Sequence, residues 1–254
     1  MRLVDLSVSI QADAPFEIFP VKIDFRSHEG EGLAAFKQIF GVSESDLVYS
    51  DGRGAGDEML TLPSHAGTHV DAPFHYGPLS EGRPAATIDE LPLEWFYADG
   101  VVLDLRHKRS GELIEVGDLQ QALTRIGYEL KPLDIVLLQT GADRNLDSPR
   151  YFEQPGMGRE STLWLVEQGI RVIGIDAFGF DRPFAAMAED FRRTGDGRHI
   201  WPAHFAGITR SYCQIEKLTN LDAIGRSHGF RVAAFPVKIR GASAGFARVV
   251  AFVD

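Results

Sequence analysis

The sequence predicts a mixed α/β fold built on a mixed sheet. Strand-like and helix-like segments alternate between residues 101 and 177, a βαβαβ pattern typical of parallel strands covered by helices. Alternating or apolar segments near both ends of the chain, at 3–10 and 230–253, add antiparallel strands. No internal repeat, low-complexity tract or interdomain linker interrupts the 254 residues, so we expect a single domain over 1–254.

Apolar runs bounded by turn residues define the individual elements. Strands are expected at 101–105, 134–140, 171–177, 230–239 and 247–253. Helices are expected at 117–126, 161–168 and 203–213. Asp118 is the expected N-cap of the first helix, Gly169 closes the second, and a turn at 241–245 joins the last two strands.

The N-terminal part is less regular. Between residues 11 and 62 only 21–25 and 59–62 resemble strands. Glycine and charged residues dominate 29–57, and an aromatic-containing stretch covers 178–203. Both are expected to be long loops of the kind that forms lids or partner-contacting arms. A disordered insertion is the alternative for the first.

Composition limits the class of protein. The chain carries 36 acidic and 26 basic residues, a net charge of −10, which disfavours nucleic acid or an anionic membrane as partner. Cys213 is the only cysteine, which excludes an intrachain disulfide and a thiolate zinc site. The first residues lack the apolar run of a signal peptide, and no segment approaches about 18 uncharged apolar residues. We therefore expect a cytoplasmic protein.

The densest group of metal-binding residue types lies between 65 and 75. The segment reads His-Ala-Gly-Thr-His-Val-Asp-Ala-Pro-Phe-His and contains His65, His69, Asp71 and His75 at even separations. In an extended chain all four side chains can share one face, whereas a helix would turn Asp71 and His75 away. Imidazole and carboxylate groups on one side indicate a divalent-metal site. Hydrogen-bonded histidines in a polar loop are the alternative.

The distances that the chain allows divide these four residues into those that can readily hold one ion and those that need a bend to reach it. His69 and Asp71 are about 6.6 Å apart at Cα in a strand, close enough to hold one ion. His65 would be about 13 Å from His69 in a fully extended chain, so a bend is needed, and Gly67 permits one. His75 lies beyond Pro73 and can turn into a second position.

Five other histidines are candidates for completing the site: His28, His107, His199, His204 and His228. His107 belongs to a charged turn that we expect at the surface, and His228 is interpreted as a histidine at a helix end near a turn. His204 follows Trp201-Pro202, and Glu216 lies twelve residues later. On spacing alone, His204 and Glu216 are either a second metal-binding pair or a helix cap and a solvated acid.

The segment 65–75 resembles the H-x-G-T-H-x-D-x-P-x-H signature of the cyclase family of metal-dependent hydrolases, with every fixed position present. That family includes bacterial kynurenine formamidases (arylformamidases), isatin hydrolases and dienelactone-type hydrolases. The context is similar as well, in the segments 5–7 (Asp-Leu-Ser), 101–105 (Val-Val-Leu-Asp-Leu), 135–141 (Ile-Val-Leu-Leu-Gln-Thr-Gly) and 174–176 (Gly-Ile-Asp). The resemblance runs from about residue 3 to the C-terminus.

The resemblance implies a swivelling β/β/α domain, usually assembled as a homodimer or larger homo-oligomer. By the same resemblance, His65, His69 and Asp71 are metal ligands, and His204 with Glu216 completes a possible second site. His75 matches the position taken as catalytic, a proton shuttle. Loops at 29–57 and 178–203 are longer than in the compact formamidases, so the formamidase substrate does not simply carry over.

The expected chemistry is metal-assisted hydrolysis of an amide (an aryl formamide or cyclic amide) or a lactone-type bond of a small, aromatic or cyclic molecule. A divalent ion lowers the pKa of bound water from about 15.7 toward about 7, and an imidazole such as His75 can carry its proton to the leaving group. Aromatic loop residues can stack on an aryl group or simply pack: Phe16, Phe19, Phe178, Phe180 and Trp201. Zn2+ and Mn2+ both suit the ligands, as one ion or two. A metal-dependent lyase or cyclase and a non-enzymatic metal-binding protein are the alternatives.

Overall fold

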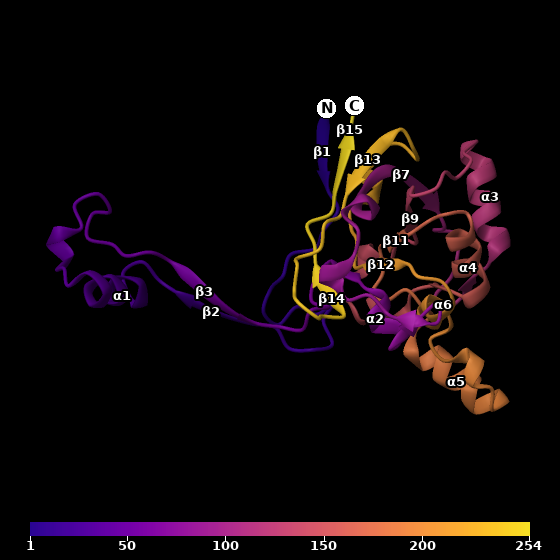
Figure 1. Cartoon of the computed structure of the whole chain (residues 1–254), viewed down its shortest axis with the longest axis horizontal. Helices are drawn as coiled ribbons and strands as arrows, with labels where there is room; N and C mark the ends of the chain where they lie inside the picture. Colours follow the sequence, from indigo (N-terminus) through magenta and orange to yellow (C-terminus); the bar gives the residue numbers. More distant parts are fainter. The chain divides into compact units, whose positions relative to one another are not determined.

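The computed structural model describes residues 1–254, and these form two compact units (Figure 1). Met1–Ile10 and Ser64–Asp254 make up the larger unit, and Gln11–Pro63 the smaller one. Each is described by itself. The single domain expected over 1–254 stays a prediction.

The larger unit is built on a nine-stranded mixed sheet with the order β1-β15-β13-β7-β9-β11-β12-β4-β14. In that order the strands are Arg2–Asp5, Val250–Val253, Phe230–Ala233, Tyr97–Asp104, Ile135–Gln139, Val172–Ile175, Cys213–Glu216, His69–Asp71 and Ala244–Phe246. The four central strands β7, β9, β11 and β12 are parallel, and every other pairing is antiparallel. The chain ends lie side by side because β1 pairs with β15 (Figure 1). The predicted mixed sheet is confirmed.

The central strands are buried on both faces, which explains their continuous apolar sequences. Val102, Leu137 and Val172 point into one hydrophobic core cluster, which also contains Phe96 and Ile224 from short 3-10 turns. The alternate residues of these strands lie on the opposite face, on which the helices pack.

Five α-helices belong to the larger unit: α2 (Pro73–Tyr76), α3 (Val116–Ile126), α4 (Arg159–Glu167), α5 (Phe184–Thr194) and α6 (Pro202–Thr209). Helix α1 (Glu31–Phe40) belongs to the smaller unit. Helices α3, α4 and α6 lie along one side of the sheet (Figure 1). Short two-stranded ladders join β8 (Leu113–Ile114) to β10 (Gly156–Met157) and β5 (Leu79–Ser80) to β6 (Arg83–Pro84). No helix has the length and apolar character needed to cross a membrane.

Several expected boundaries were wrong. The strand expected at 3–10 ends at Asp5, and only Ser7 continues it, as an isolated bridge. Helix α3 has Glu115 rather than Asp118 as its N-cap; Asp118 lies in the first turn and accepts a hydrogen bond from the Glu115 N–H at 2.8 Å. The turn expected at 241–245 contains strand β14, and the strand β12 was not predicted at all.

Both expected long loops contain a helix. Helix α5 lies within 178–203. Its apolar residues Phe184, Met187 and Phe191 recur at helical spacing, so the sequence carries a helical pattern that the expectation of a loop overlooked, although only Met187 is buried. In the smaller unit, helix α1 lies within 29–57, followed by a 3-10 turn at Glu44–Asp46. The two strands expected there are confirmed as the hairpin of β2 (Lys22–Arg26) and β3 (Asp57–Thr61).

Candidate metal centre

Two neighbouring strands position three of the six predicted site residues. Strand β4 pairs with β12 so that His69 lies directly opposite Glu216. Asp71 is two residues beyond His69 and therefore shares its face of the sheet, while Val70 between them points into the core. His69 and Asp71 are 1% and 0% exposed, and Glu216 is 8% exposed. The register of β4 and β12 thus gathers an imidazole and two carboxylates in a buried position.

A tight turn before β4 brings His65 back to the same place. Gly67 has a φ of +60°, in the left-handed region that only glycine adopts readily, so the expected bend is confirmed. His65 Nδ1 consequently lies 2.8 Å from Asp71 Oδ1, and the ring centroids of His65 and His69 are 5.0 Å apart. The residues before β4 form this turn, and the extended conformation is limited to His69–Asp71.

His75 reaches the cluster from a helix rather than from a strand. Pro73 occupies the first position of α2, where its fixed φ suits a helix, and this single turn redirects His75. The His75 ring lies 4.3 Å from that of His65 and 5.5 Å from that of His204. Helix α2 packs against α6 at Gly207, where a Cβ would lie only 2.1 Å from Tyr76, so a glycine is required there.

His204 is held by a carboxylate that the sequence did not single out. Asp181 accepts hydrogen bonds from the backbone N–H groups of Ala203 and His204 and lies 2.5 Å from His204 Nδ1. The other ring nitrogen, Nε2, therefore faces Glu216 at 3.6 Å and Asp71 at 3.9 Å. Trp201 stacks on the His204 ring with centroids 4.4 Å apart. A carboxylate that fixes a histidine in this way is typical of metal-binding histidines.

The structure thus brings all six predicted residues into one cluster. Two groups have ligand atoms within 4.8 Å of one another, His69/Asp71/Glu216 and His65/Asp71/His75, and both contain Asp71. His204 and Glu216 belong to this cluster, and their role in a possible second site stays a prediction. Of the four other candidates, His28 and His107 are exposed and His199 and His228 are half-buried, and neither group of converging ligand atoms contains any of them.

The residues fit a divalent cation. Nε2 of His69 and both carboxylate oxygens of Asp71 are buried and make no hydrogen bond with acceptable geometry, which is costly for polar atoms. The 2.8 Å distance between Asp71 Oδ1 and His65 Nδ1 is a close approach of two candidate ligand atoms. His69 Nε2 lies 3.3 Å from Asp71 Oδ1 and 3.7 Å from Glu216 Oε2, so these free ligand atoms converge. Imidazole nitrogen with carboxylate oxygen is a donor set for Zn2+ or Mn2+.

The pKa values of the cluster also favour a bound divalent cation. Burial and the neighbouring carboxylate of Asp71 raise the pKa of Glu216. Burial acts against a charged His69, but Asp71 and Glu216 outweigh it and raise its pKa. A cation between these groups would satisfy both carboxylates and hold His69 neutral. Burial also lowers the pKa of His75 to about 4, so this imidazole is neutral at pH 7.

Sequence reasoning missed Asp181 and Lys217. Lys217 is 3% exposed, and its ammonium group donates to the carbonyl of His65 at 3.1 Å. No spacing rule links Asp181 to a histidine 23 residues later. Of the aromatic residues expected to stack on a substrate, Phe180 is fully buried and packs near Tyr212, while Phe178 and Trp201 are half-buried.

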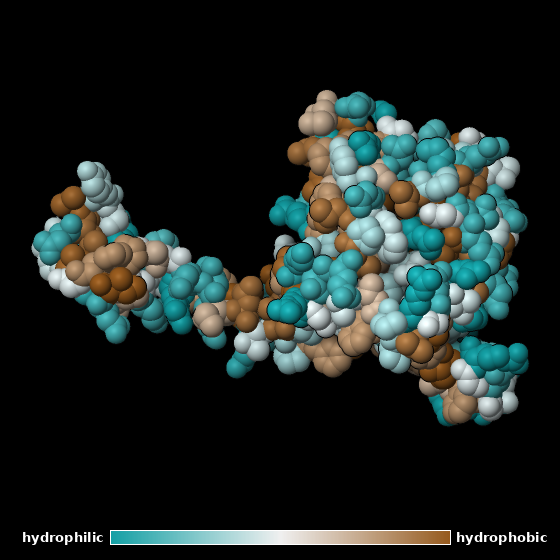
Figure 2. Space-filling model, in the orientation of Figure 1, coloured by the Kyte–Doolittle hydropathy of each residue, from teal (hydrophilic) through white to brown (hydrophobic).

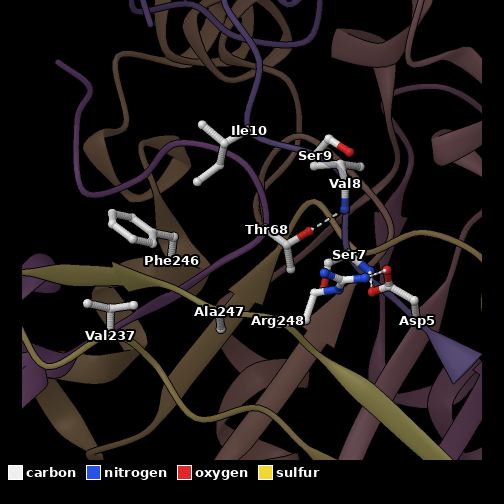
Figure 3. Close-up of a pocket in the computed structure, with 10 residues that line it drawn as sticks. All are labelled: Asp5, Ser7, Val8, Ser9, Ile10, Thr68, Val237, Phe246, Ala247 and Arg248. Carbon is white, nitrogen blue, oxygen red and sulfur yellow. Dashed lines mark hydrogen bonds and ion pairs between the residues drawn. The ribbon is translucent and has the colours of Figure 1, made fainter. Parts of the chain in front are cut away.

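A cleft of about 490 Å³ lies beside the ligand turn (Figure 3). It is lined by Asp5, Ser7, Val8, Ser9, Ile10, Thr68, Val237, Phe246, Ala247 and Arg248. Thr68 contributes its side chain, which accepts a hydrogen bond from the Val8 N–H, and Arg248 pairs with Asp5 at 2.6 Å (Figure 3). None of the six predicted site residues lines this cleft.

Known proteins resemble this chain in sequence and in fold. A kynurenine formamidase of Erythrobacter litoralis is 28% identical over 191 residues, which cover 75% of this chain and 74% of that protein. A kynurenine formamidase of Bacillus cytotoxicus is 28% identical over 123 residues, 48% of this chain and 51% of its own length. The isatin hydrolase A of Ralstonia solanacearum has a similar fold, with a TM-score of 0.76 at 23% identity, over 100% of this chain and 92% of that one.

The family described as "Putative cyclase" matches residues 4–182, more than two thirds of the chain. This range contains the segment 65–75 and Asp181, whereas His204 and Glu216 lie beyond it. The similarity of the whole fold extends over the remaining residues. The chain therefore belongs to the cyclase family.

Proposed function

We propose that the protein is a metal-dependent hydrolase that cleaves a carbon–nitrogen bond of an amide, or a lactone-type bond, in a small aromatic or cyclic molecule. The observation that carries this proposal is the convergence of the unpartnered, buried ligand atoms of His69 and Asp71 beside a neutral imidazole, His75. The kynurenine formamidases and isatin hydrolases that resemble the chain support the substrate class.

The ion would be held by His65, His69, Asp71, His204 and Glu216. His75 would accept a proton and donate it to the leaving group. When bound, a divalent ion supplies a Lewis acid that activates water and stabilises negative charge on the carbonyl oxygen. His75 accepts a proton because its imidazole is neutral, and it can return this proton to the leaving nitrogen. Trp201 and Phe178 offer aromatic surface for a ring-containing substrate.

The ion is proposed to be Zn2+ or Mn2+. The ligand types suit both. Both groups of candidate ligand atoms contain Asp71, and they are compatible with one bound ion or with two. Metal analysis of the purified protein would identify the ion and its number per chain.

A turnover screen in heavy-oxygen water tests the reaction. The metal-loaded protein is offered an aryl formamide, a cyclic amide and a lactone, and products are analysed by mass spectrometry. We expect one heavy oxygen in the product acid, because water adds to the carbonyl carbon as the carbon–nitrogen bond breaks and the nitrogen takes up a proton. Product without label would indicate a lyase or cyclase instead, and no turnover of any compound would contradict an enzymatic role for these substrates.

We also propose a cytoplasmic homodimer or larger homo-oligomer. The unit Gln11–Pro63 supports assembly, because a two-stranded hairpin is marginally stable alone and the unit exposes Phe25 of the hairpin (71%), Phe40 of α1 (63%) and Tyr49 of a loop (105%). Figure 2 shows hydrophobic residues on the surface of this segment. Sedimentation velocity is expected to give a multiple of the 28.0 kDa chain mass, and a monomer at micromolar concentration would contradict the assembly.

A further inference from the structure

Lys217 has an unusual backbone conformation beside the candidate metal centre. It directly follows Glu216 at the end of β12. Its φ of +58° lies in the left-handed region, a backbone conformation that residues with a Cβ rarely adopt. Glycine would suit this position better on backbone grounds. Residues held in such conformations cluster at functional sites, where the surrounding structure fixes them. The lysine side chain therefore requires an explanation.

The contacts of Lys217 connect three segments of the site. Its backbone N–H donates to the carbonyl of Ala177, beyond β11, at 2.9 Å. Its own carbonyl accepts a hydrogen bond from Thr68 Oγ1 at 2.5 Å. Its ammonium group donates to the carbonyl of His65 at 3.1 Å and lies 5.5 Å from the centre of the Phe178 ring. Main chain and side chain thus both hold the turn that carries His65 and precedes His69.

We propose that Lys217 is a positioning residue for the metal centre, which fixes the turn 65–68 against the end of β12. This inference rests on the proposed metal centre. The Lys217 ammonium group fixes the backbone of His65 through the His65 carbonyl oxygen. The Lys217 carbonyl fixes Thr68, which directly precedes His69, through the hydrogen bond from Thr68 Oγ1. Glycine or asparagine would accept the left-handed backbone, but neither could reach the carbonyl of His65.

Charge and position predict opposite effects of removing the ammonium group. A positive charge near a metal site repels the cation, so by charge alone a neutral residue would tighten metal binding. A positioning role predicts weaker binding, because the ligands are no longer held in place before the ion arrives. Loss of a group that orients metal ligands typically costs about 10–100-fold in affinity. The direction of the change therefore separates the two roles.

The test compares Lys217→Met and Lys217→Gly with the wild type by calorimetric titration of the full-length, metal-free protein with Mn2+ alone. We expect the Kd for Mn2+ to rise about tenfold or more in both variants. Lys217→Gly should unfold at the same or a higher temperature than Lys217→Met, because glycine adopts the left-handed conformation freely. General destabilisation would not produce this combination.

Val232→Ala is the matched control. Val232 is fully buried in the core cluster, away from the ligand residues, so its truncation lowers the unfolding temperature and should leave the Kd for Mn2+ unchanged. Wild-type or tighter Mn2+ binding by both Lys217 variants would overturn the inference while the metal centre stands. A wild-type protein that binds neither Mn2+ nor Zn2+ would overturn the metal centre and this inference together.

Discussion

Replacement of Asp71 with asparagine is expected to abolish metal binding and to lower kcat/KM by about 10³-fold or more. Asp71 is fully buried and belongs to both groups of converging ligand atoms. Asparagine keeps the shape and one oxygen but removes the negative charge, and it introduces an NH2 group that cannot bind a cation. Because a metal ion supplies several kcal/mol of transition-state stabilisation, its loss removes most of the activity.

The measurement is metal content by plasma mass spectrometry after dialysis, together with turnover of the substrate found in the screen. Asp176→Asn is a matched control, since Asp176 is also a buried carboxylate but accepts its hydrogen bonds from Thr140 and Gly141. That variant should retain its metal. Circular dichroism checks that both variants fold. A metal content in Asp71→Asn equal to that of the wild type would remove Asp71 from the site.

The sequence predicts the site better than the path of the chain through it. Residue types and spacing suffice to select His69 and Asp71, and the need for a bend identifies Gly67. The extended conformation that the alternation predicts occurs only at 69–71, where β12 and β14 flank the chain on both sides. Beyond Asp71, Pro73 starts a helical turn, which a period-two pattern does not reveal.

Elements defined by tertiary contacts were the hardest to predict. Strand β12 is four residues long, and all four are buried because β11 and β4 flank it. Its sequence, Cys-Gln-Ile-Glu, does not have the composition of a strand. The same holds for Lys217 and Asp181, whose roles depend on bonds to His65 and His204 that are far away in sequence.

The family resemblance supplied what spacing alone could not. Spacing alone allows His204 and Glu216 to be a metal-binding pair or a helix cap and a solvated acid, and the family resemblance favours the metal-binding pair. In the structure, His204 Nε2 lies 3.6 Å from Glu216 Oε1 and 3.9 Å from Asp71 Oδ2, and Glu216 Oε2 lies 3.7 Å from His69 Nε2. Strand pairing places Glu216 opposite His69, and the contact between Asp181 and His204 Nδ1 orients the His204 ring. Their roles as ligands stay predictions that metal analysis of His204→Ala and Glu216→Ala can decide.

His75→Ala is expected to lower kcat by roughly 10²–10⁴-fold while the metal content stays at the wild-type level. His75 is half-buried, and burial is the main cause that lowers its pKa to about 4, so the neutral form that accepts a proton dominates at pH 7. The positive charges that His65, His204 and His69 can carry act in the same direction, against an opposing effect of Asp71. The variant loses this proton acceptor and keeps the buried group His69/Asp71/Glu216.

The metal readout decides between the two possible roles of His75, because its ligand atom also lies within reach of His65 and Asp71. Metal loss in His75→Ala would make it a ligand, and full activity would exclude it from proton transfer. His107→Ala is the control, since His107 is exposed and should tolerate the change. Added imidazole should restore part of the activity if the missing function is proton transfer, because the free base can enter the space that the side chain leaves. The metal content separates the two cases, because imidazole that replaces a metal ligand would also restore bound metal, whereas imidazole that replaces a proton acceptor would leave the metal content unchanged.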